Sequence, residues 1–225
     1  MYIATAMTPN PLCLHPEMSL REVRDLIAGK SFRHFPVTDA GGRLVGMVSD
    51  RDLRSVLPST ALSPVVRQDE LAHLAQVPVD SIMSRPPIAL PHEATLDDAL
   101  LLFDRHRIGA LPVVDHEGRL LGIITVRDVL GAYRRLFGIG TAGSSLVEVR
   151  DDGRPNLVSR IAAALEGGGI PCTRIIRRET TEPGDTPPGV VYTRVQTCNI
   201  HAVHAALRAA GLETIQHKTG AAAPG

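Results

Sequence analysis

The sequence predicts a mixed α/β protein in which two copies of one α/β unit precede a smaller, ferredoxin-like α+β domain. Three observations support this prediction. Shifting the 225-residue chain by 76 positions superimposes residues 7–53 on residues 83–129 without a gap. In both copies, apolar residues recur at helical spacing and then with the alternation of a hairpin. From residue 145 the order becomes strand–helix–strand–strand–helix–strand, which is that of ferredoxin-like domains.

Each repeat is expected to contain a short strand, a capped helix, a hairpin and a second helix. The helix starts have the capping-box pattern, in which a hydroxyl residue precedes an acidic residue by three positions. The hairpin turns contain Asp and Gly in both copies. The expected features are short strands at 12–14 and 88–90, capping boxes Ser19–Glu22 and Thr95–Asp98, turns at 39–42 and 115–118, and second helices from Ser49 and Thr125.

Composition excludes several classes of protein. Lys+Arg and Asp+Glu number 24 each, so the chain has no net charge, and aromatic residues make up only 3% with no Trp. Both values disfavour nucleic acid as the main partner. No apolar run approaches a bilayer span, the first residues do not have the pattern of an export signal, and three cysteines cannot form a disulfide framework. We expect a soluble cytoplasmic protein with no membrane partner.

The two repeats resemble CBS domains, and together they resemble a Bateman module. The resemblance rests on Phe35-Pro-Val-Thr-Asp39 with Gly46-Met-Val-Ser-Asp-Arg-Asp52, and on Leu111-Pro-Val-Val-Asp115 with Gly122-Ile-Ile-Thr-Val-Arg-Asp128. It implies that the repeats pack through their sheets, that the clefts between them often hold adenosine-containing ligands, and that such modules usually form homodimers. The expected division is repeat 1 at 1–60, a connector with a short helix (66–76) at 61–79, and repeat 2 at 80–138.

The last third of the chain resembles an ACT domain, which often binds amino acids and often dimerises. Gly138-Ile-Gly-Thr-Ala-Gly143 has GxGxxG spacing, but it follows a helix and precedes a strand, so it is interpreted as a linker. The expected features are a linker at 139–144, strands at 145–150, 170–178, 190–197 and 212–217, helices at 157–166 and 199–210, a polar loop at 179–189, and a flexible tail at 218–225. The domain itself is placed at 145–217.

The turn Asp152-Gly-Arg-Pro-Asn-Leu157 is the part most similar to an ACT domain. The resemblance implies a ligand turn made by Asp152, Asn156 and Leu157, although the family usually has Gly where Asn156 stands. Asn156 is also expected to cap the following helix. Two CBS repeats followed by an ACT-like domain resemble, over residues 7–217, the acetoin-utilisation accessory proteins of bacteria.

Two interpretations of Ser49/Asp52 and Thr125/Asp128 remain open. Ser/Thr-x-x-Asp is a helix cap, with Asp placed favourably against the helix dipole. In CBS proteins, however, the same Asp holds the ribose and the Ser/Thr lies near the phosphate. The candidate nucleotide-binding residues are Thr8, Leu12, Arg33, His34, Phe35, Pro36, Ser49, Arg51, Asp52, Ser84, Ile88, Arg107, Gly109, Ala110, Leu111, Pro112, Thr125, Arg127 and Asp128.

The repeats differ where the chain approaches each hairpin. Arg33-His34-Phe35 is cationic and bulky, whereas Gly109-Ala110-Leu111 is small and open. We therefore expect adenine to bind more readily beside Thr125/Asp128, and a more phosphate-dependent site beside Ser49/Asp52.

No metal site and no catalytic residues are expected. Cys198, His201 and His204 recur every three residues at a helix start, but no fourth ligand accompanies them. The sequence thus predicts a non-enzymatic homodimer that senses an adenine nucleotide or adenosyl ligand (AMP or ATP first, then ADP or S-adenosylmethionine) and regulates an unidentified protein, with a role in acetoin or central carbon metabolism. The alternative is a module whose ACT-like domain dimerises or senses an amino acid while the CBS clefts stay empty.

Overall fold

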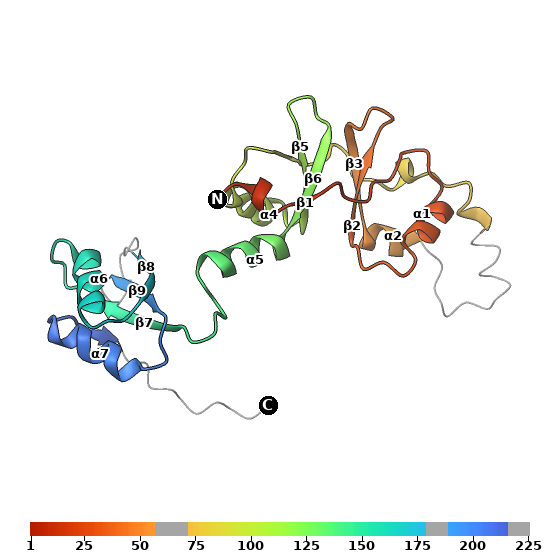
Figure 1. Ribbon diagram of the computed structural model, residues 1–225. Helices are drawn as coiled ribbons and strands as arrows, with labels where there is room; N and C mark the ends of the chain where they lie inside the picture. The colour runs from red at the N-terminus through yellow and green to blue at the C-terminus, as the bar shows by residue number, and fades with distance from the viewer. Residues whose placement is uncertain (57–71, 179–188, 216–225) are drawn as a thin grey trace. The chain divides into compact units, whose positions relative to one another are not determined.

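The computed structural model describes residues 1–56, 72–178 and 189–215. It divides into two compact units, Met1–Tyr133 and Arg134–Gly225 (Figure 1). Most of the expected connector, the polar loop at 179–188, the end of the last expected strand and the tail lie outside the described residues. The longest described helices have 11 residues, so no helix in this part of the chain is long and apolar enough to cross a membrane.

The first unit contains both repeats, and each repeat has its own hydrophobic core. The cores contain Leu20, Phe35 and Leu53 in repeat 1, and Leu96, Leu111 and Val129 in repeat 2. The elements of repeat 1 are α1 (Leu20–Ile27), β2 (His34–Thr38), β3 (Leu44–Ser49) and α2 (Asp50–Val56). Those of repeat 2 are β4 (Leu90–Pro91), α4 (Leu96–His106), β5 (Ala110–Val114), β6 (Leu120–Thr125) and α5 (Val126–Leu136). Short 3₁₀ turns occur at Ile3–Thr5 and Val79–Ser81.

The predicted capping boxes are present at the starts of α1 and α4. The backbone N–H and Oγ of Ser19 donate to Glu22, and the Glu22 N–H donates back to the Ser19 Oγ at 3.2 Å. Thr95 and Asp98 form the same reciprocal bonds. These side chains satisfy backbone donors that a helix leaves unpaired in its first turn.

The first segment of each repeat pairs with the hairpin of the other repeat, and the sequence did not predict this pairing. Strand β1 (Thr8–Pro9) pairs with β6, and Ser84 forms a bridge to Met47 in β3. The short strands expected at 12–14 and 88–90 are correspondingly reduced to a single bridge at Leu14 and to β4. Backbone pairing in both directions therefore joins the two repeats.

The two hairpin turns also contact each other. The Leu44 N–H donates to Gly118 O, and the Leu120 N–H donates to Gly42 O, both at 3.0 Å. This reciprocal pair repeats the internal symmetry of the sequence. It joins β2–β3 and β5–β6, which lie next to each other in Figure 1.

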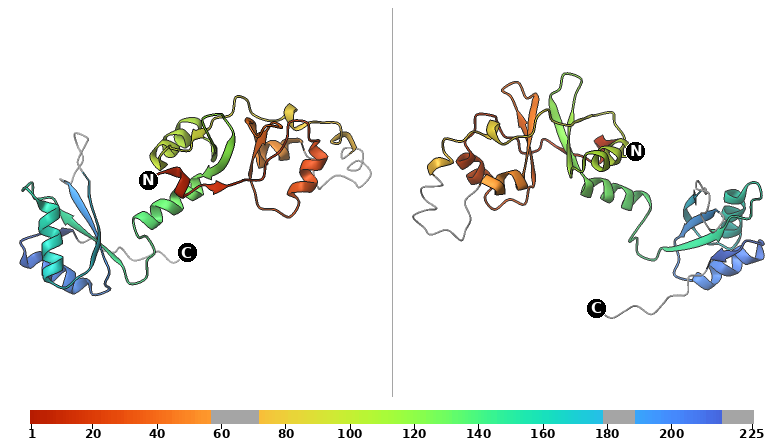
Figure 2. Two further views of the ribbon diagram at one scale, coloured as in Figure 1. Left: turned by 45° about the horizontal axis from the view of Figure 1, so that its top comes forward. Right: turned by 180° about the vertical axis from the view of Figure 1, so that it is seen from behind.

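The second unit has the predicted βαββαβ order. Its elements are β7 (Ser145–Arg150), α6 (Leu157–Gly167), β8 (Cys172–Arg178), β9 (Val190–Val195), α7 (Ile200–Ala209) and β10 (Thr214–Ile215). The strands form an antiparallel sheet in the order β10-β7-β9-β8. Both helices lie against one face of it (Figure 2). Residues 138–143, where the GxGxxG spacing was interpreted as a linker, form turns between α5 and β7.

Of the two helix caps in the second unit, one differs from expectation. Asn156 adopts a left-handed conformation (φ 58°) and makes no side-chain cap, although α6 does begin at Leu157. Asn tolerates this conformation better than most residues, which explains its presence where glycine is usual. Asn199 does cap α7, because its Oδ1 accepts from the Ala202 N–H at 3.1 Å.

Candidate functional site

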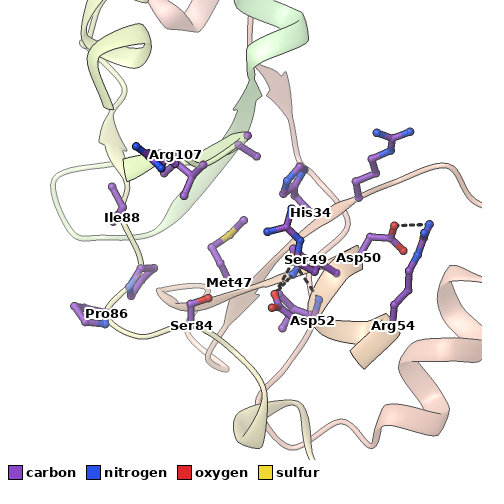
Figure 3. A pocket seen from close by; sticks show the side chains of 17 residues that line it. His34, Met47, Ser49, Asp50, Asp52, Arg54, Ser84, Pro86, Ile88 and Arg107 are labelled. Carbon is purple, nitrogen blue, oxygen red and sulfur yellow. Dashed lines mark hydrogen bonds and ion pairs between the residues drawn. The ribbon is translucent and has the colours of Figure 1, made fainter. Parts of the chain in front are cut away.

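A cavity of about 630 Å³ lies between the two repeats (Figure 3). This volume is within the range of small-molecule sites. Repeat 1 contributes Arg33, His34, Met47, Val48, Ser49, Asp50, Arg51, Asp52 and Arg54. The segment before and within repeat 2 contributes Ser84, Pro86, Pro87, Ile88, Arg107, Ile108, Gly109 and Ala110. The cavity is therefore a joint product of both repeats.

Asp52 caps the first turn of α2 and still has one oxygen available. Its Oδ2 accepts from both the backbone N–H and the Oγ of Ser49, each at 2.7 Å, and the Asp52 N–H donates to Ser49 Oγ at 3.3 Å. Within the described residues, Oδ1 has no hydrogen-bond partner. A carboxylate oxygen can accept more than one hydrogen bond, so capping and ligand binding do not exclude each other.

Thr125 and Asp128 form the same cap at the start of α5. Oδ2 of Asp128 accepts from the backbone N–H and the hydroxyl of Thr125, at 2.8 and 2.7 Å. Neither residue lines the cavity around Asp52. The structure thus contains two copies of one cap, of which one lies in the described cavity.

The charged side chains of the cavity fall into two groups. Asp50 and Arg54 form an ion pair at 2.7 Å on α2, so their charges largely neutralise each other. Arg33, Arg51 and Arg107 are exposed, and none has a carboxylate partner among the described residues. Three guanidinium groups, from both repeats, are therefore available for an anion, which Arg binds through directed N–H donors.

His34 and Gly109 meet across the cavity. A Cβ added at Gly109 would lie 3.5 Å from Cε1 and Nε2 of the His34 ring. Burial, together with the nearby Arg33 charge, lowers the pKa of His34 below its ordinary value of 6.5, while Asp50 and Asp52 oppose this change. The imidazole is consequently held mainly in its neutral form at neutral pH.

Apolar groups form the remaining wall. Met47 and Ile88 are half-buried, and Ala110 is buried. Pro86 and Pro87 precede Ile88 in the segment that leads into repeat 2. In Figure 3, Ile88 and Arg107 lie on the side of the cavity away from Asp52, and Met47 lies between them and Ser49. The cavity wall therefore combines apolar surface with charged groups.

The structure places the approach to the second hairpin next to both caps. Gly109 and Ala110 lie beside Thr125 as expected, because Ala110 pairs with Thr125 and the Val126 N–H donates to Gly109 O. They also line the Asp52 cavity together with Arg33 and His34. The reason is the crossing of the chain between repeats, which places repeat 2 opposite the cap of repeat 1. Preferred binding of adenine beside Asp128 stays a prediction.

The other candidate residues do not line this cavity. Thr8 is exposed and belongs to β1, Leu12 packs against the repeat 1 core, and Arg127 is exposed on α5. Four of the candidates are buried in the two hairpins: Phe35, Pro36, Leu111 and Pro112. The sequence analysis missed seven lining residues: Met47, Val48, Asp50, Arg54, Pro86, Pro87 and Ile108. The available signal was the repeat, because two similar hairpins can each pair with the starting segment of the other repeat.

In the second unit, the turn resembling an ACT ligand site is satisfied internally. Both oxygens of Asp152 accept from Arg160, at 2.6 and 2.8 Å, and this contact lowers the pKa of the Asp152 carboxyl. Leu157 is buried in the core. Of the predicted ligand residues, only Asn156 is exposed without such a contact, so the turn presents few free groups to an amino acid.

Comparison with known proteins agrees with the architecture of the first unit. The CBS domain family matches residues 3–59 and 79–135, together more than half of the chain. A CBS domain-containing protein of Dictyostelium discoideum is 37% identical over 100 residues, which cover 44% of this chain and 68% of that protein. Inosine-5'-monophosphate dehydrogenase of Aquifex aeolicus is 30% identical over 177 residues, or 73% of this chain. Only 31% of the dehydrogenase is covered, so the chain spans about a third of that relative's length.

Solved structures show the same similarity. CBSX2, a CBS-pair protein from Arabidopsis thaliana, is 30% identical with a TM-score of 0.51, over 61% of this chain and 96% of that chain. A structure of CBSX2 in complex with AMP is 28% identical with a TM-score of 0.50, over 60% and 98% of the two chains. A protein attributed to acetoin utilization (AcuB) from Vibrio cholerae is 27% identical with a TM-score of 0.50, over 62% and 94%.

Proposed function

The chain belongs to the CBS-domain family, and we propose that its paired repeats bind an adenine nucleotide, with AMP as the first candidate, in the cavity around Asp52. The observation that supports this proposal most directly is the polarity of the cavity. The cavity has a carboxylate with a free oxygen, three guanidinium groups without carboxylate partners and an apolar wall. These groups complement the ribose hydroxyls, the phosphate and the base of a nucleotide. The complex of the similar protein CBSX2 with AMP supports the same ligand class.

Each part of the ligand has a matching part of the cavity. The ribose hydroxyl groups donate to Oδ1 of Asp52, which the helix cap leaves free. The phosphate lies toward Arg33 and Arg51, because two carboxylates in the first turn of α2 make that helix end unsuitable for an anion. Adenine lies against Met47 and Ile88, where a flat base replaces water on apolar surface.

We infer a regulatory role from the joint construction of the cavity. A ligand that contacts both repeats binds best when they are correctly placed, so binding shifts the population toward that placement. The signal would reach an unidentified protein, and the chain would have no catalytic step of its own. The similarity to AcuB is consistent with a place in acetoin metabolism, and the CBS regions shared with dehydrogenases are consistent with regulation of an enzyme.

The experiment compares two equivalent carboxylates. Asp52→Asn and Asp128→Asn alter the same helix cap in the two repeats, but only Asp52 lines the cavity. We expect Asp52→Asn to weaken AMP binding about tenfold to a hundredfold, the effect of a lost hydrogen bond to a charged group. Asp128→Asn should leave AMP affinity unchanged, and it should lower the melting temperature by about as much as Asp52→Asn does. Calorimetric titration of AMP, beside a thermal melt, measures both.

Two results would count against the proposal. Equal weakening by the two variants would mean that Asp52 has no special role, and unchanged affinity in both would leave Asp52 as a helix cap alone. A thermal-shift screen with AMP, ADP, ATP, NADH and S-adenosylmethionine then ranks ligands, because a ligand that binds only the folded state raises its apparent stability.

For the second unit, we propose a role in joining two chains rather than in sensing amino acids. One face of its sheet is covered by α6 and α7, while the other carries the exposed side chains of Leu146 and Ile176. The internal ion pair of Asp152 with Arg160 removes the charged group that an amino acid would need at the ACT-like turn. The ACT-like resemblance therefore favours its dimerising role here.

A further inference from the structure

Two histidines and a glutamate converge at the turn end of repeat 2. His92 and Glu93 follow β4, and His116 lies in the turn between β5 and β6. One ligand atom from each side chain lies within 4.8 Å of the others. None of the three lines the Asp52 cavity, so this cluster is separate from the proposed nucleotide site.

The glutamate lies between the two imidazoles. Its Oε1 is 2.9 Å from Nε2 of His116, and its Oε2 is 3.3 Å from Nδ1 of His92. The two rings meet edge to face, with centroids 5.5 Å apart and planes at 71°. Nδ1 of His92 is buried and makes no hydrogen bond within the described residues. A buried ring nitrogen without a hydrogen-bond partner is costly in the free protein, and a bound cation would remove that cost.

The backbone holds the three residues in place. The His92 N–H donates to Val114 O at 3.2 Å, which ties the turn after β4 to the end of β5. Asp115 fixes the hairpin turn, because its Oδ1 accepts from the N–H groups of Glu117 and Arg119 at 2.9 and 2.8 Å. The ligand atoms therefore come from two short turns that are hydrogen-bonded to one strand, a rigid arrangement that suits a metal site.

The first repeat provides an internal comparison. A shift of 76 residues places Pro16, Glu17 and Ala40 at the positions of His92, Glu93 and His116. Repeat 1 folds with Pro and Ala at these positions, so the fold itself does not need either histidine. Repeat 2 has both histidines, and both lie next to Glu93, which corresponds to Glu17 of repeat 1.

We propose that His92, Glu93 and His116 bind a divalent transition metal of the Zn²⁺ class. Two imidazole nitrogens and one carboxylate are a ligand set that Zn²⁺, Co²⁺ and Ni²⁺ accept, and water would complete the coordination. Around Zn²⁺, ligand atoms at about 2.0–2.1 Å from the metal lie roughly 3.3 Å from one another. The nitrogen–oxygen distances of 2.9 and 3.3 Å are close to this value, so binding requires only small side-chain movements.

Metal binding would stabilise the β5–β6 hairpin, whose turn contacts repeat 1. The turn containing His116 also contains Gly118, whose carbonyl accepts from the Leu44 N–H of repeat 1. A metal that links this turn to the segment after β4 therefore stabilises the side of the turn that contacts repeat 1. The effect does not depend on a nucleotide.

The test uses the full-length, tag-free protein after treatment with a chelator, in the absence of nucleotide. Calorimetric titration with Zn²⁺ should show one specific equivalent, and Co²⁺ should give the visible absorption of a low-coordinate nitrogen–oxygen site. His116→Ala, which copies the residue of repeat 1, and Glu93→Gln should each weaken Zn²⁺ binding about tenfold or more, since even supporting residues of metal sites have effects of that size. Zn²⁺ should raise the melting temperature of the unaltered protein but not that of these two variants.

The matched controls are Glu17→Gln, the equivalent change in repeat 1, and His106→Ala, which removes an exposed histidine elsewhere in repeat 2. Both should bind Zn²⁺ as the unaltered protein does. Absence of a specific equivalent would overturn the proposal. So would equal weakening by His106→Ala and His116→Ala, because that pattern indicates scattered surface histidines. Failure of AMP binding would not affect this result, since the two sites share no residue.

Discussion

His34 illustrates, at the scale of one residue, how the proposed ligand would change a side chain. Burial and Arg33 lower its pKa in the folded chain, so the unfolded chain binds more protons below pH 6.5. Stability present above pH 6.5 is therefore lost as pH falls toward the folded pKa, and no further loss follows below it. A phosphate placed beside Arg33 should reverse the shift, because it stabilises the imidazolium.

We expect NMR titration to show a His34 pKa below 6.5 in the free protein and a higher one with saturating AMP. By linkage, AMP affinity should increase as the pH is lowered between these two values. His201, which is exposed on α7 in the second unit, provides the control resonance and should not respond to AMP. A His34 pKa that stays the same while AMP binds would exclude phosphate from this part of the cavity.

The sequence could predict residue types at this site better than their grouping. Ser49 and Asp52 were predicted as either a cap or a ribose site, and the geometry shows that one carboxylate has an oxygen for each role. Gly109 lies beside Thr125 as predicted, but its second position, in the Asp52 cavity, was missed because the pairing of segments between repeats depends on contacts far apart in the chain. The cluster at His92 was missed since its third member comes from a separate turn.

At the scale of elements, two glycines permit the crossing between repeats. A Cβ added at Gly122 would lie 2.8 Å from Met7 Sδ and 2.9 Å from the backbone oxygen of Thr8. A Cβ added at Gly46 would lie 2.4 Å from Met83 Sδ and 2.9 Å from its Cγ. An added Cβ at either position would therefore overlap the segment that crosses from the other repeat. At Gly46 the overlap is with a methionine side chain, which can move more easily than the backbone oxygen near Gly122.

We predict that Gly122→Ala lowers the free energy of unfolding by about 1–3 kcal/mol, the usual cost of overpacking, and that Gly46→Ala lowers it less. Gly109→Ala is the control in the same unit, because its added Cβ makes only an ordinary 3.5 Å contact with His34. Urea unfolding of the three variants measures the order. Equal stability of Gly122→Ala and Gly109→Ala would mean that β1 does not pack against β6 as described.

Local patterns accounted for most helices and hairpins, because capping boxes, turn residues and apolar spacing act within a few residues. They could not place strands in a sheet. The strands at 145–150 and 190–197 were predicted to pair edge to edge or face to face with a second copy. In the structure, β7 and β9 are the two central strands, and β8 and β10 are the outer ones. Sheet order is non-local, so alternation in one strand does not indicate its position. Edge pairing through β7 and β9 is therefore excluded.

At the scale of the whole molecule, the open face of the second unit's sheet presents apolar side chains to a second chain. Leu146 is 50% exposed and Ile176 is 39% exposed on the face opposite α6 and α7. Glu148 pairs with Tyr192 and lies on the same face as Leu146, while Arg194 is opposite Leu146 itself. Apolar groups flanked by charges of both signs can meet their own copy across a twofold axis.

We predict that the full-length chain is a dimer with twice the 24.1 kDa mass of one chain, and that Leu146→Glu weakens it. The change places a negative charge in an apolar contact, where desolvation opposes association. Val158→Glu is the control, since Val158 is 41% exposed on α6, which lies on the covered side of the sheet. Light scattering over a range of concentrations should show a shift toward monomer for Leu146→Glu only, with circular dichroism confirming that both variants fold. A monomeric unaltered protein would refute the dimer, and equal shifts in the two variants would place the interface away from the open face.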